Sequence, residues 1–293
     1  MPKDLLQVIE TGMPGFSKGQ KRIARYISEH YDKAAFMTAS RLGDTVGVSE
    51  STVVRFAAEV GFEGYPQLQK NLQEIIRNRL TTVQRMDIID EHSSDADVLA
   101  RVLGQDCEKI HRTLEEVNRT VFSAAVDAII SARNIYILGI RSSSTLANFL
   151  SFYFNQMFPH VRCLNTCSTS ETFEQMLRIG TGDVFICFSF PRYSQRTLKA
   201  AQYAKRQGAV VIAMTDSQSA PLAGVADLVL LARSEMASCV DSLVAPLSLT
   251  NAIIVAVGIK KKEELASTYN KLEQIWAEYN VYEKTDFSGR QSS

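Results

Sequence analysis

Hydrophobic and polar positions between residues 39 and 60 follow the period of two short helices. In the second helix, the apolar residues share the i, i+3, i+4, i+7 spacing of a buried stripe: Val53, Phe56, Ala57 and Val60. The opposite side of this helix carries short or polar side chains: Ser51, Thr52, Arg55 and Ala58. The pattern predicts a helix with one buried face and one small, polar face.

The join between the two helices has the residues of a sharp turn. Gly47 tolerates the positive φ that such a turn needs, and the hydroxyl of Ser49 can cap the following helix by accepting from its backbone N–H groups. Leu42 and Val46 supply the apolar side of the first helix. This arrangement is typical of a helix-turn-helix, which lays its second helix in the DNA major groove. An ordinary helical hairpin is the alternative.

The residues around this pair favour DNA binding. Ser17 and Gln20 have capping-box spacing, and the helix they begin has an apolar face that completes a three-helix core: Ile23, Tyr26, Ile27 and His30. Base contacts are expected from the start of the second helix: Ser49, Ser51, Thr52 and Arg55. Arg55 can hold either a guanine edge or a phosphate. Basic residues nearby are candidates for phosphate contacts, or else solvated surface charges: Lys18, Lys21, Arg22, Lys70 and Arg77.

From residue 135 onward, short apolar runs alternate with helical patterns. Five runs are apolar on both faces and predict strands: Ile135 to Leu138, Val161 to Leu164, Val184 to Phe188, Val210 to Met214, and Leu228 to Leu231. This βαβ rhythm predicts a doubly wound parallel sheet covered by helices on both sides. The expected fold class is therefore an all-α helix-turn-helix domain followed by an α/β domain. Ligands of such sheets bind beyond the carboxyl ends of the strands.

Two hydroxyl-rich loops follow the first and third predicted strands, at 139–145 and 189–195, and each contains an arginine. Serine hydroxyls and arginines at helix N-termini suit a phosphate or a carboxylate, so an anionic ligand is expected. The candidate effector-binding residues are Arg141, Ser142, Ser143, Ser144, Ser189, Arg192, Tyr193 and Ser194. Simple N-capping by the serines, with each arginine paired to a neighbouring carboxylate, is the alternative.

The composition limits the remaining possibilities. The 293 residues have no net formal charge and contain five scattered cysteines without a Cys-x-x-Cys pair, so neither a zinc site nor a disulfide framework is expected. Without a signal peptide or membrane-spanning run, we expect a cytoplasmic protein with no membrane partner. The predicted domains are 1–86 for DNA binding, 87–97 as a linker, 98–284 for ligand binding and 285–293 as a frayed tail. A long helix is expected from Tyr65 to Arg85.

Several independent motifs give the chain a family resemblance. They are the run from Ser49 to Phe56, then Gly61-Phe62 and Gly64-Tyr65-Pro66, and in the second half Ala200-Ala-x-x-Ala-Lys-x-x-Gly-Ala209, Ala213-Met-Thr-Asp216, Ala220-Pro-Leu-Ala223 and Ala226-Asp227. With these motifs the chain resembles the RpiR-type bacterial transcriptional regulators, which join a helix-turn-helix domain to a SIS (sugar isomerase) domain. The resemblance implies a sugar-phosphate site in which Ser143, Ser189 and Ser194 match the family's hydroxyls.

The chain departs from the family at both ligand turns. Arg141 stands where the Gly-x-Gly-x-Ser turn has its second glycine, and Pro191 and Arg192 replace the inner Ser-Gly of the Ser-x-Ser-Gly-x-Thr turn. Proline removes a backbone N–H, while each arginine adds a positive charge. We therefore expect an anionic carbohydrate derivative, such as a phosphorylated sugar acid, as the effector.

The resemblance also raises the alternative of a sugar-phosphate isomerase, because SIS domains occur in such enzymes. An isomerase needs a positioned base, and Glu171, Glu174, His111 and His160 offer no assembled acid–base pair, so we expect no catalysis and no cofactor. A module whose first domain only mediates assembly is a further alternative. The preferred hypothesis is an allosteric regulator, a homodimer or tetramer on an inverted-repeat DNA site, with repression and activation both open.

Overall fold

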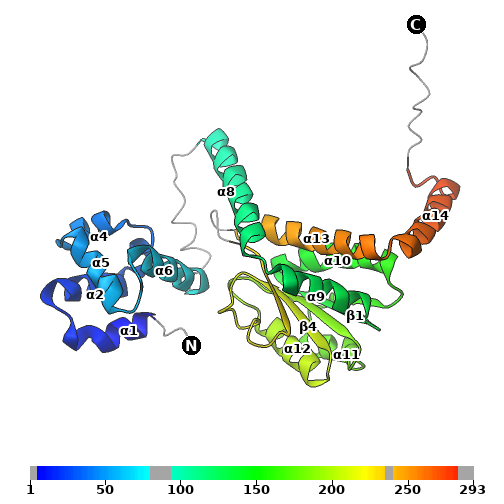
Figure 1. Ribbon diagram of the computed structural model, residues 1–293, viewed down its shortest axis with the longest axis horizontal. Coiled ribbons are helices and arrows are strands. Elements are labelled where there is room, and N and C mark those ends of the chain that lie inside the picture. The colour runs from blue at the N-terminus through cyan, green and yellow to red at the C-terminus, as the bar shows by residue number, and fades with distance from the viewer. Residues whose placement is uncertain (1–4, 80–93, 235–239, 283–293) are drawn as a thin grey trace, which may run out of the picture. The chain divides into compact units, whose positions relative to one another are not determined.

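The computed structural model describes residues 5–79, 94–234 and 240–282, which form two compact units. Of these residues, the first unit contains 5–79 and 94–98 together with 191–193 and 240–241, and the second contains the others. Figure 1 shows a helical first unit and a second unit in which helices enclose a sheet. Each unit has its own apolar core, in agreement with the predicted fold class.

The first unit is all-helical. Its elements are α1 (Leu5–Gly12), η1 (Met13–Gly15), α2 (Lys18–Glu29), α3 (Tyr31–Ala34), α4 (Ala39–Val46), α5 (Glu50–Glu59) and α6 (Tyr65–Arg79). The predicted three-helix core is too small, because α1 and α6 also bury side chains in it, including Leu5, Ile9, Leu68 and Leu72. Burial raises the pKa of Tyr65 to about 12, and its hydroxyl donates to the Met37 carbonyl at 2.8 Å, which ties α6 to the segment before α4.

Helices α4 and α5 form the predicted helix-turn-helix. Gly47 ends α4 with a φ of 68°, as the turn requires. The stripe of α5 is buried as predicted, with Val53, Phe56 and Ala57 fully inaccessible to solvent. A second glycine, Gly43, permits the close approach of the two helices, because a Cβ there would lie 2.7 Å from the Val48 carbonyl oxygen. His30 is exposed and follows the last residue of α2, so its predicted place on the buried face is wrong.

The second unit contains a five-stranded parallel sheet in the order β2-β1-β3-β4-β5. Its strands are β1 (Ile135–Gly139), β2 (Val161–Cys163), β3 (Val184–Phe188), β4 (Val210–Thr215) and β5 (Leu228–Leu231). The surrounding helices are α8 (Asp95–Glu116), α9 (Arg119–Ile130), α10 (Ser144–Met157), α11 (Thr169–Gln175), α12 (Gln195–Arg206), α13 (Val244–Lys260) and α14 (Lys262–Glu278), with the short turn η2 (Arg141–Ser143) before α10. All five predicted strands are confirmed to within one residue.

The sheet is buried on both faces, because alternate residues of each strand enter different cores. Ile135 and Ile137 face α9, α10 and α13, whereas Tyr136 and Leu138 face the core that contains α12. Helices lie on both sides of the strands in Figure 1. This double burial explains why the strands read as continuous apolar runs in the sequence.

The amino edge of the sheet is held by one buried carboxylate. Asp183, fully buried before β3, accepts from Arg133 Nε at 3.0 Å, from Arg133 Nη2 at 3.1 Å, from Asn134 Nδ2 at 2.8 Å and from the Gly180 N–H at 2.9 Å. Burial alone would raise the pKa of Asp183, but these hydrogen bonds and the Arg133 charge lower it below its usual range. This network fixes the loops that precede β1 and β3.

The last residues of the predicted linker belong to a helix. Helix α8 starts at Asp95 with Ser94 as its cap, so residues 95–97 are helical, and the larger part of the 87–97 segment lies outside the described residues. The predicted long helix after Tyr65 is described as far as Arg79. Among the helices that the structure describes, none alone has the length and apolar character to cross a bilayer, and only the bent pair α13 and α14 satisfies these criteria jointly.

Candidate functional site

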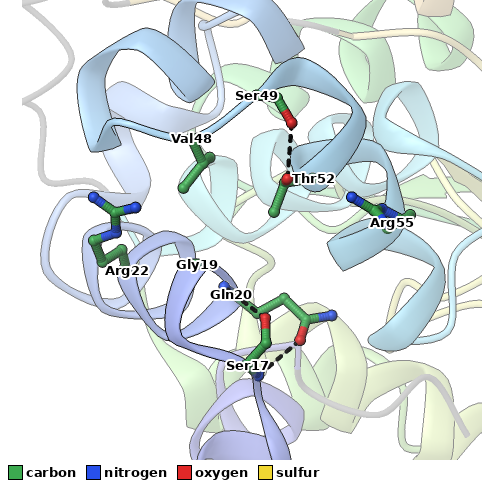
Figure 2. Close-up of a pocket in the computed structure, with 8 residues that line it drawn as sticks. All are labelled: Ser17, Gly19, Gln20, Arg22, Val48, Ser49, Thr52 and Arg55. Atoms are coloured by element: carbon green, nitrogen blue, oxygen red, sulfur yellow. Dashed lines mark hydrogen bonds between the residues drawn. The ribbon is translucent and has the colours of Figure 1, made fainter.

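A hollow of about 520 Å³ opens between the start of α2 and the start of α5. Figure 2 shows the residues that line it: Ser17, Gly19, Gln20, Arg22, Val48, Ser49, Thr52 and Arg55. The structure thus brings together three of the four residues predicted to contact bases and one of the predicted phosphate contacts, Arg22. The lining is rich in hydroxyls and contains two guanidinium groups, a combination suited to phosphate oxygens and base edges.

The prediction that the Ser49 hydroxyl caps α5 is wrong. This hydroxyl lies 2.9 Å from Ser51 Oγ and 2.9 Å from Thr52 Oγ1, and α5 has no side-chain cap. Arg55 Nε donates to the Ser51 carbonyl at 3.3 Å, one turn back along the helix. The first turn of α5 therefore presents a connected set of hydroxyls beside an exposed arginine.

The two helix starts are held close together by small residues. A Cβ at Gly19 would lie 3.4 Å from Thr52 Cγ2 and 3.5 Å from Val48 Cγ1, so α2 approaches the turn before α5 through a position without a side chain. The predicted capping box is present, because Gln20 N donates to Ser17 Oγ at 3.4 Å and Ser17 N donates to Gln20 Oε1 at 2.8 Å. Arg22 reaches the same turn from α2, with Nη1 3.2 Å from an ideal Cβ at Gly47.

The other candidate phosphate contacts lie outside the hollow. Lys18 and Lys21 are exposed on the first turns of α2, and Lys70 is exposed on α6. The Arg77 side chain lies outside the described part of the structure. The sequence identified Ser17 and Gln20 only as a helix cap. The available signal for their place in the hollow was the apolar face of α2, which was expected to pack over the helix pair.

The two ligand loops begin side by side at the carboxyl edge of the sheet. Gly139 and Phe188, the last residues of β1 and β3, are partners in the parallel register. After β1 the chain turns back sharply, since a Cβ at Gly139 would lie 2.2 Å from the Ser143 carbonyl oxygen. Only glycine leaves room for this turn, which places the 141–144 segment directly above the strand end.

Both arginines that replace family glycines keep a glycine-like backbone. Arg141 has a φ of 58° and Arg192 a φ of 64°, in the left-handed region that side chains rarely adopt. Both residues are exposed. Glycine would adopt this conformation without strain, and backbone strain of this kind concentrates at ligand-binding sites.

The serines of the loops divide into buried and accessible groups. Ser143 and Ser189 are buried, with 6% and 4% of their surfaces exposed, whereas Ser142 is exposed and Ser144 and Ser194 are half-buried. Ser189 Oγ accepts from Ser194 N at 3.2 Å, which closes the second loop on itself. Tyr193, also predicted to bind the effector, is half-buried.

N-capping explains only part of the hydroxyl content. Ser194 caps α12 by accepting from Thr197 N at 3.2 Å, and Ser144 Oγ donates to the Arg141 carbonyl at 2.6 Å. The Ser143 side chain makes no cap for α10. The capping alternative is therefore correct for Ser194 and does not account for Ser143.

Two threonines outside the set of predicted effector-binding residues belong to this edge. Thr215, at the end of β4, donates to the Ser189 carbonyl at 2.7 Å and holds the start of the second loop. Thr197 is fully buried in the first turn of α12, and its hydroxyl oxygen has no hydrogen-bond partner among the described residues. Its position three residues after Ser194 was the available signal.

The acid–base candidates are used structurally or lie apart. Glu171 accepts from the Thr166 hydroxyl and, at 3.2 Å, from Gln175 Nε2, in the first turn of α11. His111 is exposed on α8, and His160 is exposed just before β2, at the opposite edge from the loops. Across 5–79, 94–234 and 240–282 no cluster of three or more metal-ligating side chains occurs.

Comparison with known families assigns both units. Residues 3–79 match the helix-turn-helix domain of the rpiR family, and residues 128–256 match the SIS domain. The chain belongs to the RpiR family of transcriptional regulators. The resemblance inferred from the motifs is thereby confirmed, as is the fold class.

Curated relatives that match most of this chain are named as transcriptional regulators. An HTH-type transcriptional regulator from Caldanaerobacter subterraneus is 24% identical over 280 residues, which covers 93% of this chain and 96% of the relative. The regulator HexR from Pseudomonas aeruginosa is 24% identical over 234 residues, which covers 78% of this chain and 78% of HexR. These names agree with the expectation of a DNA-binding regulator rather than an isomerase.

Solved structures support the fold. The sugar isomerase domain of an RpiR transcription factor from Sphaerobacter thermophilus matches 60% of this chain and 98% of its own, with a TM-score of 0.57 and 24% identity. The NanR protein of Vibrio vulnificus, solved with ManNAc-6P, matches 94% of this chain and 98% of its own, with a TM-score of 0.57 and 19% identity.

Proposed function

We propose that this RpiR-family regulator binds an anionic carbohydrate derivative at the carboxyl edge of its sheet and that binding changes its affinity for an inverted-repeat DNA site. The main observation behind this proposal is the pair of loops that follow the neighbouring strands β1 and β3. Each loop contains serines and an arginine with a positive φ. The similarity in fold between this chain and NanR, which was solved with the phosphosugar ManNAc-6P, also supports the proposal.

The two arginines favour an effector with a carboxylate in addition to a phosphate. Ser143, Ser189 and the start of α12 offer hydroxyls and backbone N–H groups of the kind that hold a phosphate. Arg141 and Arg192 add guanidinium groups, which can bind a carboxylate through two parallel hydrogen bonds. A phosphorylated sugar acid fits both parts of this site, with Thr197 and Thr215 as supporting residues.

Calorimetry with two matched ligands tests the effector site. Glucitol 6-phosphate and 6-phosphogluconate are both open-chain and differ only at C1, where the second carries a carboxylate. The full chain should bind 6-phosphogluconate more tightly, and Arg141→Gly should remove that preference while leaving phosphate-dependent binding. Equal affinity of the parent protein for both ligands would refute a carboxylate-binding role for the arginine.

For the DNA-binding unit, we propose that Ser49, Ser51, Thr52 and Arg55 approach bases and that Lys18, Lys21, Arg22 and Lys70 contact phosphates. The hollow between α2 and α5 supports this assignment, because Arg22 and Arg55 both line it. Selection of bound duplexes from a random pool should yield an inverted repeat, since a homodimer presents two reading helices at a fixed separation.

Substitutions in the first unit can distinguish a DNA-binding role from a role in assembly alone. Arg55→Ala should weaken binding to the selected duplex by about 1 to 3 kcal/mol. The matched control is Arg25→Ala, an exposed arginine of α2 outside the hollow, which should change binding little. Equal DNA affinity of all three proteins would favour the alternative in which the first unit only mediates assembly.

A further inference from the structure

Helix α13 has the composition of a buried helix but one exposed face. No charged residue occurs from Val244 to Ile259, and a helix that is apolar all round is normally covered on every side. Yet its outward stripe is accessible, with Leu247 37%, Val255 52% and Ile259 69% exposed. This stripe therefore calls for a covering partner.

An apolar groove lies at one end of this stripe. It has a volume of about 340 Å³ and lies between α8, α9 and the first half of α13, lined among others by Ile110, Leu114, Phe122 and Leu249. Leu114, at its margin, is 61% exposed. Arg119 of α9 also lines the groove and adds a positive charge.

An apolar arm lies at the other end of the stripe. Helix α14 turns away from α13 by 98°, and Figure 1 shows it projecting from the end opposite α8. Leu265 anchors its base beside Gly258, but none of the residues 262–278 is buried. Half-buried apolar residues recur along it at helical spacing: Leu265, Tyr269, Leu272 and Trp276.

The arm is too distant to fill the groove of its own chain. Seventeen residues separate the two ends of α13, which corresponds to about 25 Å of helix. A twofold axis through the middle of α13 exchanges these ends, so the arm of each copy would meet the groove of the other. The charges also match, because the arm has four glutamates against two lysines and is therefore net negative, whereas the groove carries Arg119.

We infer that two copies of this chain pair antiparallel along α13 and exchange their α14 arms, each placing Trp276 against the α8–α9–α13 groove of its partner. This inference rests on the assembly part of the proposed function and specifies the surface that assembles. A self-complementary surface of this kind is what a twofold dimer requires, and apolar contact with an aromatic anchor supplies its affinity.

Sedimentation and fluorescence of the full chain test the arm exchange. Trp276 is the only tryptophan in the sequence, so its emission reports on the arm alone. The parent protein should sediment as a dimer with blue-shifted emission, and dilution should shift the emission to the red as monomers form. Leu114→Glu, on the partner's groove, should raise the dimer Kd about a hundredfold and cause the same red shift.

The matched control is Leu177→Glu, at a position 74% exposed after α11 and outside the groove, the stripe and the arm. It should alter neither dimerisation nor emission, and circular dichroism should show all variants folded. A monomer at high concentration would overturn both the assembly proposal and this surface. If the protein is a dimer and Leu114→Glu does not change the Trp276 emission, only this surface is overturned. The same holds if the Trp276→Glu variant dimerises with the Kd of the parent protein.

Discussion

The two edges of the same sheet use charge in opposite ways. At the amino edge, the buried Asp183 carboxylate accepts four hydrogen bonds and is matched by the guanidinium of Arg133. At the carboxyl edge, Arg141 is exposed on a left-handed backbone, and the buried Thr197 hydroxyl lacks a partner among the described residues. Satisfied charges stabilise the fold, whereas strained and incompletely paired groups retain their binding capacity for a ligand.

The largest effect on stability is expected at the amino edge. Asp183→Ala should lower the free energy of unfolding by about 3 kcal/mol, because it leaves the buried donors that surround the carboxylate without an acceptor. Denaturant unfolding measures the loss, and Asp127→Ala, an exposed aspartate of α9, is the control. If both variants lost equally little, the contrast between the edges would be wrong.

A smaller loss is expected where the first ligand loop turns back. Gly139→Ala should destabilise the protein by about 2 kcal/mol, because the new methyl group would overlap the Ser143 carbonyl and displace the loop. It should also weaken 6-phosphogluconate binding. In the control, Gly224→Ala, the nearest atom to the new methyl group would be the Pro221 carbonyl oxygen at 3.6 Å, so little change is expected.

Low pH should weaken the contribution of Asp183, at the amino edge, to the stability of the fold. Since the folded-state pKa of Asp183 lies below its unfolded value, its contribution is complete above the unfolded pKa and is lost as pH falls through the folded pKa. The parent protein should therefore lose more stability below about pH 4 than Asp183→Asn, whose side chain does not titrate. Parallel pH profiles from thermal unfolding of the two proteins would contradict this assignment.

The smallest effect on stability, with the opposite sign, is expected at the first strained arginine. Arg141→Gly relieves a left-handed backbone and should raise the free energy of unfolding by about 0.5 kcal/mol, after the entropy cost of glycine is deducted. Effector affinity should fall in the same variant. Arg141→Ala keeps the strain and removes the charge, so it should lose affinity without gaining stability.

Much of the fold was accessible from the sequence because its signals are local. The strands were predicted to within one residue, since burial on both faces leaves uninterrupted apolar runs, and Gly47 marked the turn between α4 and α5. The Asp183 network escaped prediction because its partner Arg133 lies 50 residues away in sequence, and nothing local to either residue indicates the pair.

The positions of the candidate site residues were predictable in outline and not in detail. Adjacent parallel strands had to bring their following loops together, so the 139–145 and 189–195 segments could be paired from topology alone. The direction of the Ser49 hydroxyl, toward Ser51 and Thr52 rather than the backbone, depends on side-chain geometry that spacing does not specify. The positive φ of Arg141 could not be predicted for a different reason, because arginine rarely adopts this backbone conformation.

The left-handed backbone at Arg141 and Arg192 also bears on how such regulators diverge. Many arginine codons become glycine codons by a single base change, and the main chain at both positions already has the conformation that glycine prefers. An exchange between arginine and glycine at either position therefore needs one base change and no rearrangement of the main chain.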